Sequence, residues 1–103
     1  MLYKGEAKMI KNISIYELKN IISDKNILII DTREKSEYKK RRLLGAINIE
    51  IDEIDKILEI CPDKNKKILV YCSKGVRSIV VAERLDELGY TKIYNLEEGI
   101  EKN

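Results

Sequence analysis

The stretch Ile68-Leu69-Val70-Tyr71-Cys72-Ser73-Lys74-Gly75-Val76-Arg77-Ser78 decides how the rest of the chain is interpreted. It predicts an apolar strand over 68–71, a short polar loop headed by Cys72, and a helix from Ser78. In open α/β sheets, ligands bind beyond the carboxyl ends of the strands, which is where this cysteine falls. The question it raises is whether Cys72 is a reactive nucleophile or a small core residue.

The segments on either side alternate between strands and helices. Apolar runs predict strands at 8–12, 27–30, 46–49, 68–71 and 92–95. Segments with one apolar face or high charge predict helices at 14–22, 34–42, 53–60, 78–88 and 97–102. Ser14 and Glu17 form a capping-box pattern, and Asp52 is the expected cap of the helix that follows it. This alternation predicts a three-layer α/β/α domain with a mostly parallel sheet of about five strands.

Length and charge limit the function classes. The chain has 103 residues, which fits one domain over 1–103, with 1–7 as a loose lead-in. A net charge of +2, with Lys and Glu interspersed, argues against nucleic-acid binding. No apolar run reaches the length of a signal peptide core or a membrane span, so we expect no membrane association and a reducing cytoplasm.

The sequence contains two cysteines and no histidine. A disulfide framework and a zinc site are therefore not expected, and neither is a cofactor. The absence of histidine also excludes a Cys–His pair, so any activation of the thiol must come from backbone amides, Lys74 or Arg77.

Three features around Cys72 favour a reactive thiol. The amino terminus of a helix carries roughly half a positive elementary charge, which favours an anion there. Gly75 allows the backbone to turn so that successive amides point inward as an anion-binding nest. Lys74 and Arg77 would stabilise a thiolate further. Such a thiolate needs no general base and suits attack on sulfur, although a buried structural cysteine is the alternative.

Cys61, the second cysteine, falls on the same predicted helix face as Ile54, Ile57 and Leu58. We interpret it as a core residue. The alternative is a resolving thiol that attacks a persulfide on Cys72.

Taken together, the motifs along the chain resemble those of single-domain rhodaneses, the sulfurtransferase family. The resemblance extends from about Met9 to Lys102. Its motifs are Asp31-Thr32-Arg33, Glu37-Tyr38, Gly45-Ala46-Ile47-Asn48, the cysteine loop 71–78, Gly89-Tyr90 and Tyr94-Asn95-Leu96-Glu97.

The resemblance implies that Cys72 accepts a sulfane sulfur and carries it as a persulfide. The amides of Ser73, Lys74, Gly75, Val76 and Arg77 would hold that sulfur, and Lys74 would attract the donor. Arg77 would contact the donor or hold the loop through an acidic partner, while Asp31 and Arg33 would brace the crevice. The implied partners are a small anionic donor such as thiosulfate, a thiol or cyanide acceptor, and a sulfur-relay protein.

Two other functions remain open at this point. One is a cysteine-dependent phosphatase or arsenate reductase, but related phosphatases have five residues between Cys and Arg, whereas four lie between Cys72 and Arg77. The other is a non-enzymatic sulfur carrier or regulatory binding domain.

The chain also departs from the family pattern in two places. Arg41-Arg42-Leu43-Leu44 stands where many relatives have Gly-His-Ile-Pro, so we expect a less rigid loop. At the C-terminal end, Glu98-Gly99 replaces a Gly-Gly pair and Asn103 stands in place of a Trp.

Overall fold

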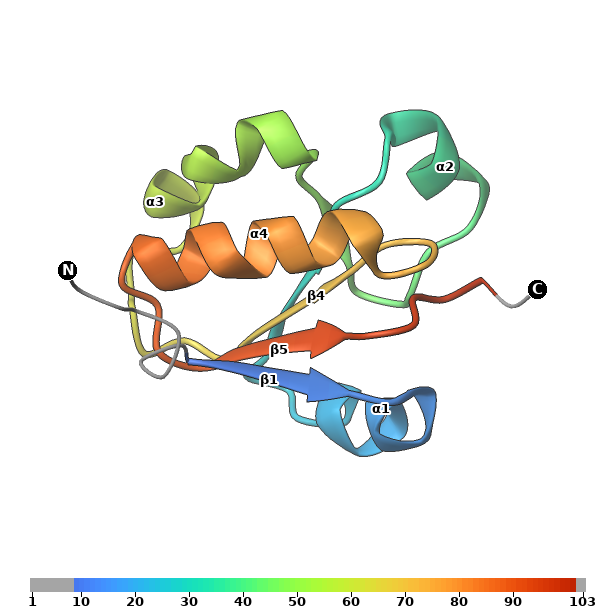
Figure 1. Ribbon diagram of the computed structural model, residues 1–103, viewed down its shortest axis with the longest axis horizontal. Coiled ribbons are helices and arrows are strands. Elements are labelled where there is room, and N and C mark those ends of the chain that lie inside the picture. Colours follow the sequence, from blue (N-terminus) through green and yellow to red (C-terminus); the bar gives the residue numbers. More distant parts are fainter. Residues whose placement is uncertain (1–8, 102–103) are drawn as a thin grey trace, which may run out of the picture.

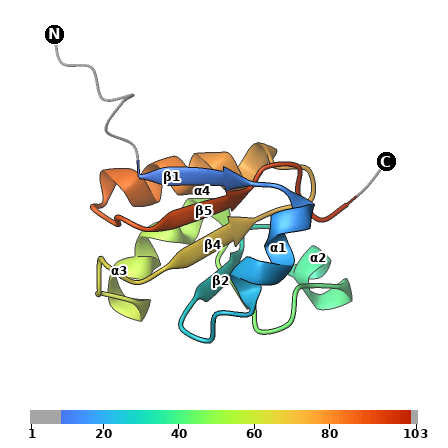
Figure 2. The same cartoon turned by 90° about the horizontal axis from the view of Figure 1, so that it is seen from below.

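A sheet of five parallel strands forms the centre of the molecule in the computed structural model, which describes residues 9–101 (Figure 1). The strands are β1 (Ile10–Ile13), β2 (Leu28–Asp31), β3 (Ile47–Asn48), β4 (Ile68–Tyr71) and β5 (Ile93–Leu96). Their order is β1-β5-β4-β2-β3, and every pairing is parallel. Figure 2 shows β1, β5, β4 and β2 side by side and pointing the same way. The predicted mostly parallel, five-stranded sheet is confirmed.

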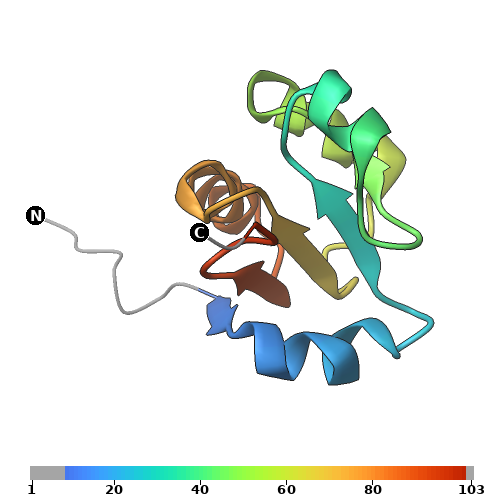
Figure 3. The ribbon, with the colours of Figure 1, turned by 90° about the vertical axis from the view of Figure 1, so that its right-hand side faces the viewer.

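Helices cover both faces of this sheet, so the three-layer prediction is also confirmed. Helix α1 (Ile15–Ile22) lies on one face, and α4 (Val76–Glu87) lies on the other beside η2 (Ile51–Lys56) and α3 (Ile57–Ile60) (Figure 3). Helix α2 (Lys35–Lys40) lies beyond the carboxyl ends of the strands (Figure 1). None of the helices within residues 9–101 is long and apolar enough to cross a membrane.

The position of strand β4 inside the sheet explains why its sequence is continuously apolar. Ile68 and Val70 join the hydrophobic cluster under α4 and η2, while Leu69 and Tyr71 join the cluster on the α1 side. All four side chains are completely buried. A strand covered on both faces needs apolar residues at every position, because neither set of side chains meets water.

Helix α1 begins as predicted. The Ser14 amide donates to the Glu17 carboxylate at 2.9 Å, and the Glu17 amide donates to the Ser14 hydroxyl at 3.3 Å. These bonds satisfy two backbone donors that the first turn would leave free. Ile13 and Leu18, on either side of the cap, are both buried in the α1-side cluster.

The predicted helix at 53–60 is partly wrong, because its first half is a 3₁₀ helix that begins at Ile51 after Glu50 rather than after Asp52. Ile51, Ile54 and Ile57 recur every three residues, which is the period of a 3₁₀ helix, and all three pack into the core. Leu58, which an α-helix would bury beside Ile54, is 40% exposed.

The predicted helix at 97–102 is wrong over its described part. Residues 97–98 form a turn, Gly99 adopts a φ of +75°, and the chain then runs alongside the cysteine loop. The amide of Ile100 donates to the Cys72 carbonyl at 3.0 Å and that of Glu101 to the Ser73 carbonyl at 2.9 Å. These two amides therefore bond to the loop rather than to a helix of their own. Predictions for residues 1–8, Lys102 and Asn103 lie outside the described residues.

Candidate active site

Cys72 follows the last residue of β4 and lies at the amino-terminal end of α4. Its side chain is buried, and Sγ accepts a hydrogen bond from the Gly75 amide at 3.0 Å and from the Ser78 amide at 3.3 Å. The Ser78 hydroxyl oxygen lies 3.5 Å from the same sulfur. Several donors therefore converge on one sulfur atom.

These contacts determine the acidity of the thiol. Burial alone would raise the pKa of Cys72, because it disfavours the charged form. Hydrogen bonds from the Ser78 hydroxyl and from the amides of Ser78, Arg77 and Gly75 outweigh burial, so that the pKa lies below its ordinary value. Gly75 and Arg77 belong to the expected nest of amides, and Ser78 adds an amide from outside it. These bonds do more to stabilise the thiolate than a neighbouring cation.

Gly75 makes this arrangement possible. It has a φ of +91°, which turns its amide toward Sγ, and a Cβ there would lie 1.9 Å from the Glu97 carbonyl oxygen. Helix α4 starts immediately afterwards at Val76, two residues before its predicted start. The loop is consequently shorter than the sequence suggested, and the first amides of α4 surround the sulfur.

Arg77 contacts an acidic partner, as expected for a residue that holds the loop. Its guanidinium group binds the Glu37 carboxylate in α2 with two bonds of 2.7 and 3.1 Å, and it also donates to the Ser73 hydroxyl at 3.3 Å. The hydrogen bond from Arg77 is the largest cause that lowers the pKa of Glu37 to about 2. Helix α2 is thus fastened to the cysteine loop.

Lys74 and Val76 project from the loop toward solvent. Both are exposed, Val76 by 75%. They help to line a pocket of about 340 Å³ that also contains Cys72. The remaining lining residues are Glu37, Ser73, Arg77 and Glu101. This pocket gives a small molecule access to the loop.

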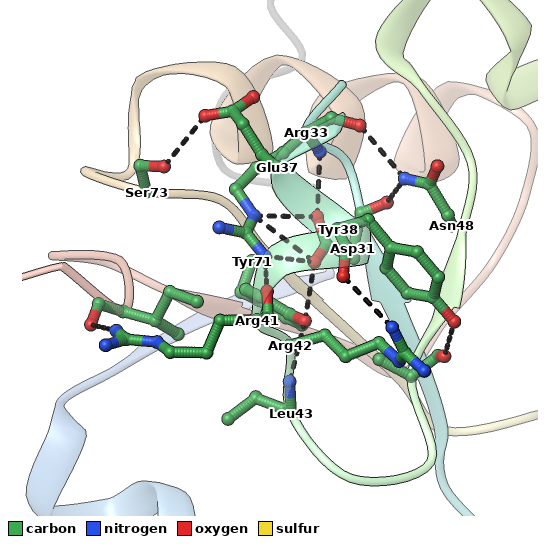
Figure 4. A network of polar contacts seen from close by, with 12 residues as sticks. Asp31, Arg33, Glu37, Tyr38, Arg41, Arg42, Leu43, Asn48, Tyr71 and Ser73 are labelled. Atoms are coloured by element: carbon green, nitrogen blue, oxygen red, sulfur yellow. Dashed lines mark hydrogen bonds and ion pairs between the residues drawn. The ribbon is translucent and has the colours of Figure 1, made fainter. Parts of the chain in front are cut away.

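Asp31 and Arg33 lie behind the site in a buried network (Figure 4). Their side chains form an ion pair at 2.8 Å, and the Tyr71 hydroxyl donates to Asp31 at 2.7 Å. That hydroxyl also accepts the Leu43 amide at 3.0 Å, and Arg33 donates to the Arg41 carbonyl. Burial, with the bond to Asp31, raises the pKa of Tyr71. The pair lies in position to brace neighbouring loops and does not contact the sulfur.

The same network also contacts the segment 41–44, which was expected to form a less rigid loop. Arg41 and Leu43 are bonded through their backbones as described above, and the Arg42 guanidinium stacks 4.5 Å from the centre of the Tyr38 ring. Backbone bonds to buried side chains thus hold this segment. Leu44, at its tip, is 95% exposed.

Cys61 lies at the opposite end of α4 from Cys72. The Cys61 carbonyl accepts a hydrogen bond from the hydroxyl of Tyr90, a residue that follows the last turn of α4. Cys72, in contrast, contacts the first turn of α4. The twelve residues of α4 span about 18 Å. Cys61 is half-buried against the core, as predicted, and this separation argues against a resolving role.

Three contributors were not assigned roles from the sequence: Ser78, Glu37 and Glu101. Ser78 ends the stretch 68–78, and its position at the start of a helix that follows a cysteine could have indicated a contact with Cys72. Glu37 belongs to the motif Glu37-Tyr38. Glu101 had no signal, because its contact with Ser73 depends on the path of residues 97–101.

The fold and this site define a parallel α/β domain with a buried cysteine whose sulfur accepts backbone amides. A family model for the rhodanese-like domain matches residues 14–102. The chain belongs to the rhodanese-like domain family, and the resemblance in its motifs is confirmed.

Named relatives and solved structures agree with this assignment. Thiosulfate sulfurtransferase GlpE of Coxiella burnetii is 32% identical over 93 residues, covering 90% of this chain and 86% of the relative. Thiosulfate sulfurtransferase PspE of Escherichia coli is 40% identical over 67 residues, or 64% of each chain. A rhodanese-like domain protein from Staphylococcus aureus has a TM-score of 0.75 at 33% identity, covering 86% of each chain.

Proposed function

We propose that this protein is a sulfurtransferase that moves a sulfane sulfur from a donor such as thiosulfate to a thiophilic acceptor, cyanide or a thiol. The observation that carries the proposal is the convergence of donors on Cys72 Sγ, which lowers the pKa of a buried thiol. The names of the sulfurtransferase relatives support it.

The proposed reaction has two steps. The Cys72 thiolate attacks the outer sulfur of thiosulfate, the sulfur–sulfur bond of the donor breaks, and sulfite leaves with the bonding electrons. An acceptor then attacks the outer sulfur of the Cys72 persulfide, and Cys72 leaves as the thiolate. In each step one bond to the transferred sulfur forms while another breaks, so the proposed reaction needs no cofactor.

The loop residues have distinct proposed roles. The amides of residues 73–77, that of Val76 included, hold the outer sulfur, and Gly75 keeps the backbone in the turn that directs them. Lys74 attracts an anionic donor. Arg77 fixes the loop to α2, while Asp31 and Arg33 brace the crevice from behind.

The test measures persulfide formation on Cys72 by mass spectrometry and sulfur transfer from thiosulfate to cyanide. We expect wild type and Cys61→Ser to be active and Cys72→Ala to be inactive, because only Cys72 lies in the cradle. If Cys72→Ala and wild type behave alike with several donors, the proposal fails. Turnover of an aryl phosphate that depends on Cys72 would instead favour a phosphatase.

We further propose a cytoplasmic location, since reduced cysteines persist there. A sulfur-relay protein is a proposed partner, because an exposed loop can exchange sulfur with another protein as well as with a small molecule.

A further inference from the structure

The charged residues that line the Cys72 pocket are not equally available to an incoming molecule. Formally, Lys74 and Arg77 are positive, and Glu37 and Glu101 are negative. The bidentate contact between Arg77 and Glu37 cancels one charge of each sign. A molecule entering the pocket therefore meets Lys74 and Glu101.

Glu101 is held more firmly than Lys74. Its backbone amide donates to the Ser73 carbonyl at 2.9 Å. Its carboxylate lies 3.3 Å from the Ser73 hydroxyl, which shares its single proton with the Glu37 carboxylate at the same distance. The preceding amide, that of Ile100, is bonded to the Cys72 carbonyl. Within residues 9–101 the exposed Lys74 side chain makes no hydrogen bond or ion pair. A charge carried on a docked backbone stays beside the loop at each encounter, whereas the unbonded Lys74 side chain must lose entropy to hold one position.

We propose that Glu101 is a specificity-determining residue that selects, by charge, among the thiols that take sulfur from Cys72, while Lys74 serves the anionic donor. It favours thiols with a cationic group beside the reacting sulfur over anionic ones of the same size. A cation in that position pairs with the fixed carboxylate, and a carboxylate or sulfonate there is repelled by it. The inference deepens the proposed function, because sulfur exchange at Cys72 is itself proposed.

Other cations near the site oppose this preference. A second hollow, of about 410 Å³, shares Glu37 and Glu101 with the Cys72 pocket and adds Lys40, Arg41 and Arg33. Arg33 is neutralised by Asp31, and Arg41 donates to the Ile100 carbonyl at 3.2 Å. An anionic substrate long enough to reach Lys40 or Arg41 would gain attraction there. The probes must therefore be short.

The first experiment probes the unloaded thiol and does not depend on sulfur transfer. In a Cys61→Ser background, Cys72 is modified by two methanethiosulfonates of similar size, one with a trimethylammonium and one with a sulfonate group. The thiolate attacks the sulfenyl sulfur, methanesulfinate leaves, and a mixed disulfide forms. The ratio of the two rate constants reports the local charge, because changes in intrinsic thiol reactivity cancel.

We expect Glu101→Gln to lower the cation-to-anion ratio about tenfold, or ~1.4 kcal/mol. Lys74→Gln removes the opposite charge and raises the ratio. Glu98→Gln is the matched control, since it makes the same charge change in the same segment but does not line the pocket. Glu101→Asp retains the charge and keeps the ratio. If the ratio in Glu101→Gln equals that of wild type, or if Glu101→Asp lowers it equally, the inference is overturned.

The second experiment applies the same comparison to the persulfide. Cysteamine and mercaptoacetate, short thiols of opposite charge, attack the outer sulfur of loaded Cys72 and release its thiolate. Glu101→Gln is expected to reduce the preference for cysteamine. Failure of Cys72 to load refutes the proposed function, whereas the first experiment still tests Glu101. A preference for mercaptoacetate that Glu101→Gln leaves unchanged assigns the selection to Lys40 and Arg41 and overturns the inference.

Discussion

Replacing Gly99 by alanine tests whether the segment 97–101 sets the geometry of the cysteine loop. A Cβ at Gly99 would lie 2.1 Å from the Ser73 carbonyl oxygen and 2.5 Å from the Lys74 nitrogen. Both are backbone atoms, so the two segments would have to separate. The change would displace the Ser73 carbonyl, which accepts the Glu101 amide. It would also displace Ser73 and Lys74, which precede Gly75.

The cost has two parts. A left-handed φ costs a non-glycine residue about 1–2 kcal/mol. Forcing an extra carbon into a packed contact costs about 1–3 kcal/mol more. Gly45→Ala supplies the matched control, because Gly45 has a φ of +84° but nothing within 4 Å of its Cβ position. We therefore expect Gly99→Ala to lose about 2–5 kcal/mol of unfolding free energy and Gly45→Ala about 1–2 kcal/mol.

Urea unfolding at equilibrium measures both losses, and equal m-values verify that the unfolded states are comparable. The rate of persulfide formation on Cys72 is measured alongside. Gly99→Ala should slow it, because the Gly75 amide moves away from Sγ, whereas Gly45→Ala should leave it unchanged. Equal destabilisation by the two substitutions would refute the idea that close contact at Gly99, rather than its dihedral angle, constrains the loop.

Three further changes test other contacts. Ser78→Ala removes a donor to Cys72 and should raise the pKa of that thiol, so thiolate absorbance should appear at higher pH; an unchanged titration would contradict the assigned hydrogen bond. Glu37→Gln breaks the pair with Arg77. Because the pKa of Glu37 is lowered from 4.5 to about 2, the pair stabilises the fold above the ordinary carboxyl pKa and loses this effect as pH falls through that interval. With both side chains about one-third exposed, we expect a loss of about 1 kcal/mol at neutral pH and a flatter acid limb in urea unfolding; a variant with the wild-type pH dependence would count against the pair. Tyr71→Phe leaves the buried Asp31 carboxylate and the half-buried Leu43 amide with one bond fewer and should cost about 1–3 kcal/mol, with a thermal melt matching wild type as the contrary result.

Strands and the cysteine loop could be predicted because their signals are local. Strand β4 was placed at its observed bounds from four consecutive apolar residues, and the cap of α1 from Ser14 and Glu17. The 3₁₀ helix was missed because residues three apart in sequence lie on one side of both helix types. The spacing of Ile51, Ile54 and Ile57 therefore fits an α-helix almost as well as a 3₁₀ helix.

The partners within the site could not be predicted because they are far apart in sequence. Arg77 and Glu37 are separated by 40 residues, and Ser73 and Glu101 by 28. The sequence suggested that Lys74 and Arg77 would stabilise the thiolate. Once folded, Arg77 is paired with Glu37, and hydrogen bonds to the sulfur take that role.

The position of β5 has a consequence for the growing chain. Of the described strands it is the last in sequence, yet it lies between β1 and β4. During synthesis, β4 and Cys72 leave the ribosome before β5 does, and the carbonyls of Cys72 and Ser73 then lack the amides of Ile100 and Glu101. The cysteine loop gains these two backbone contacts only after β5 has inserted and the segment behind it has docked.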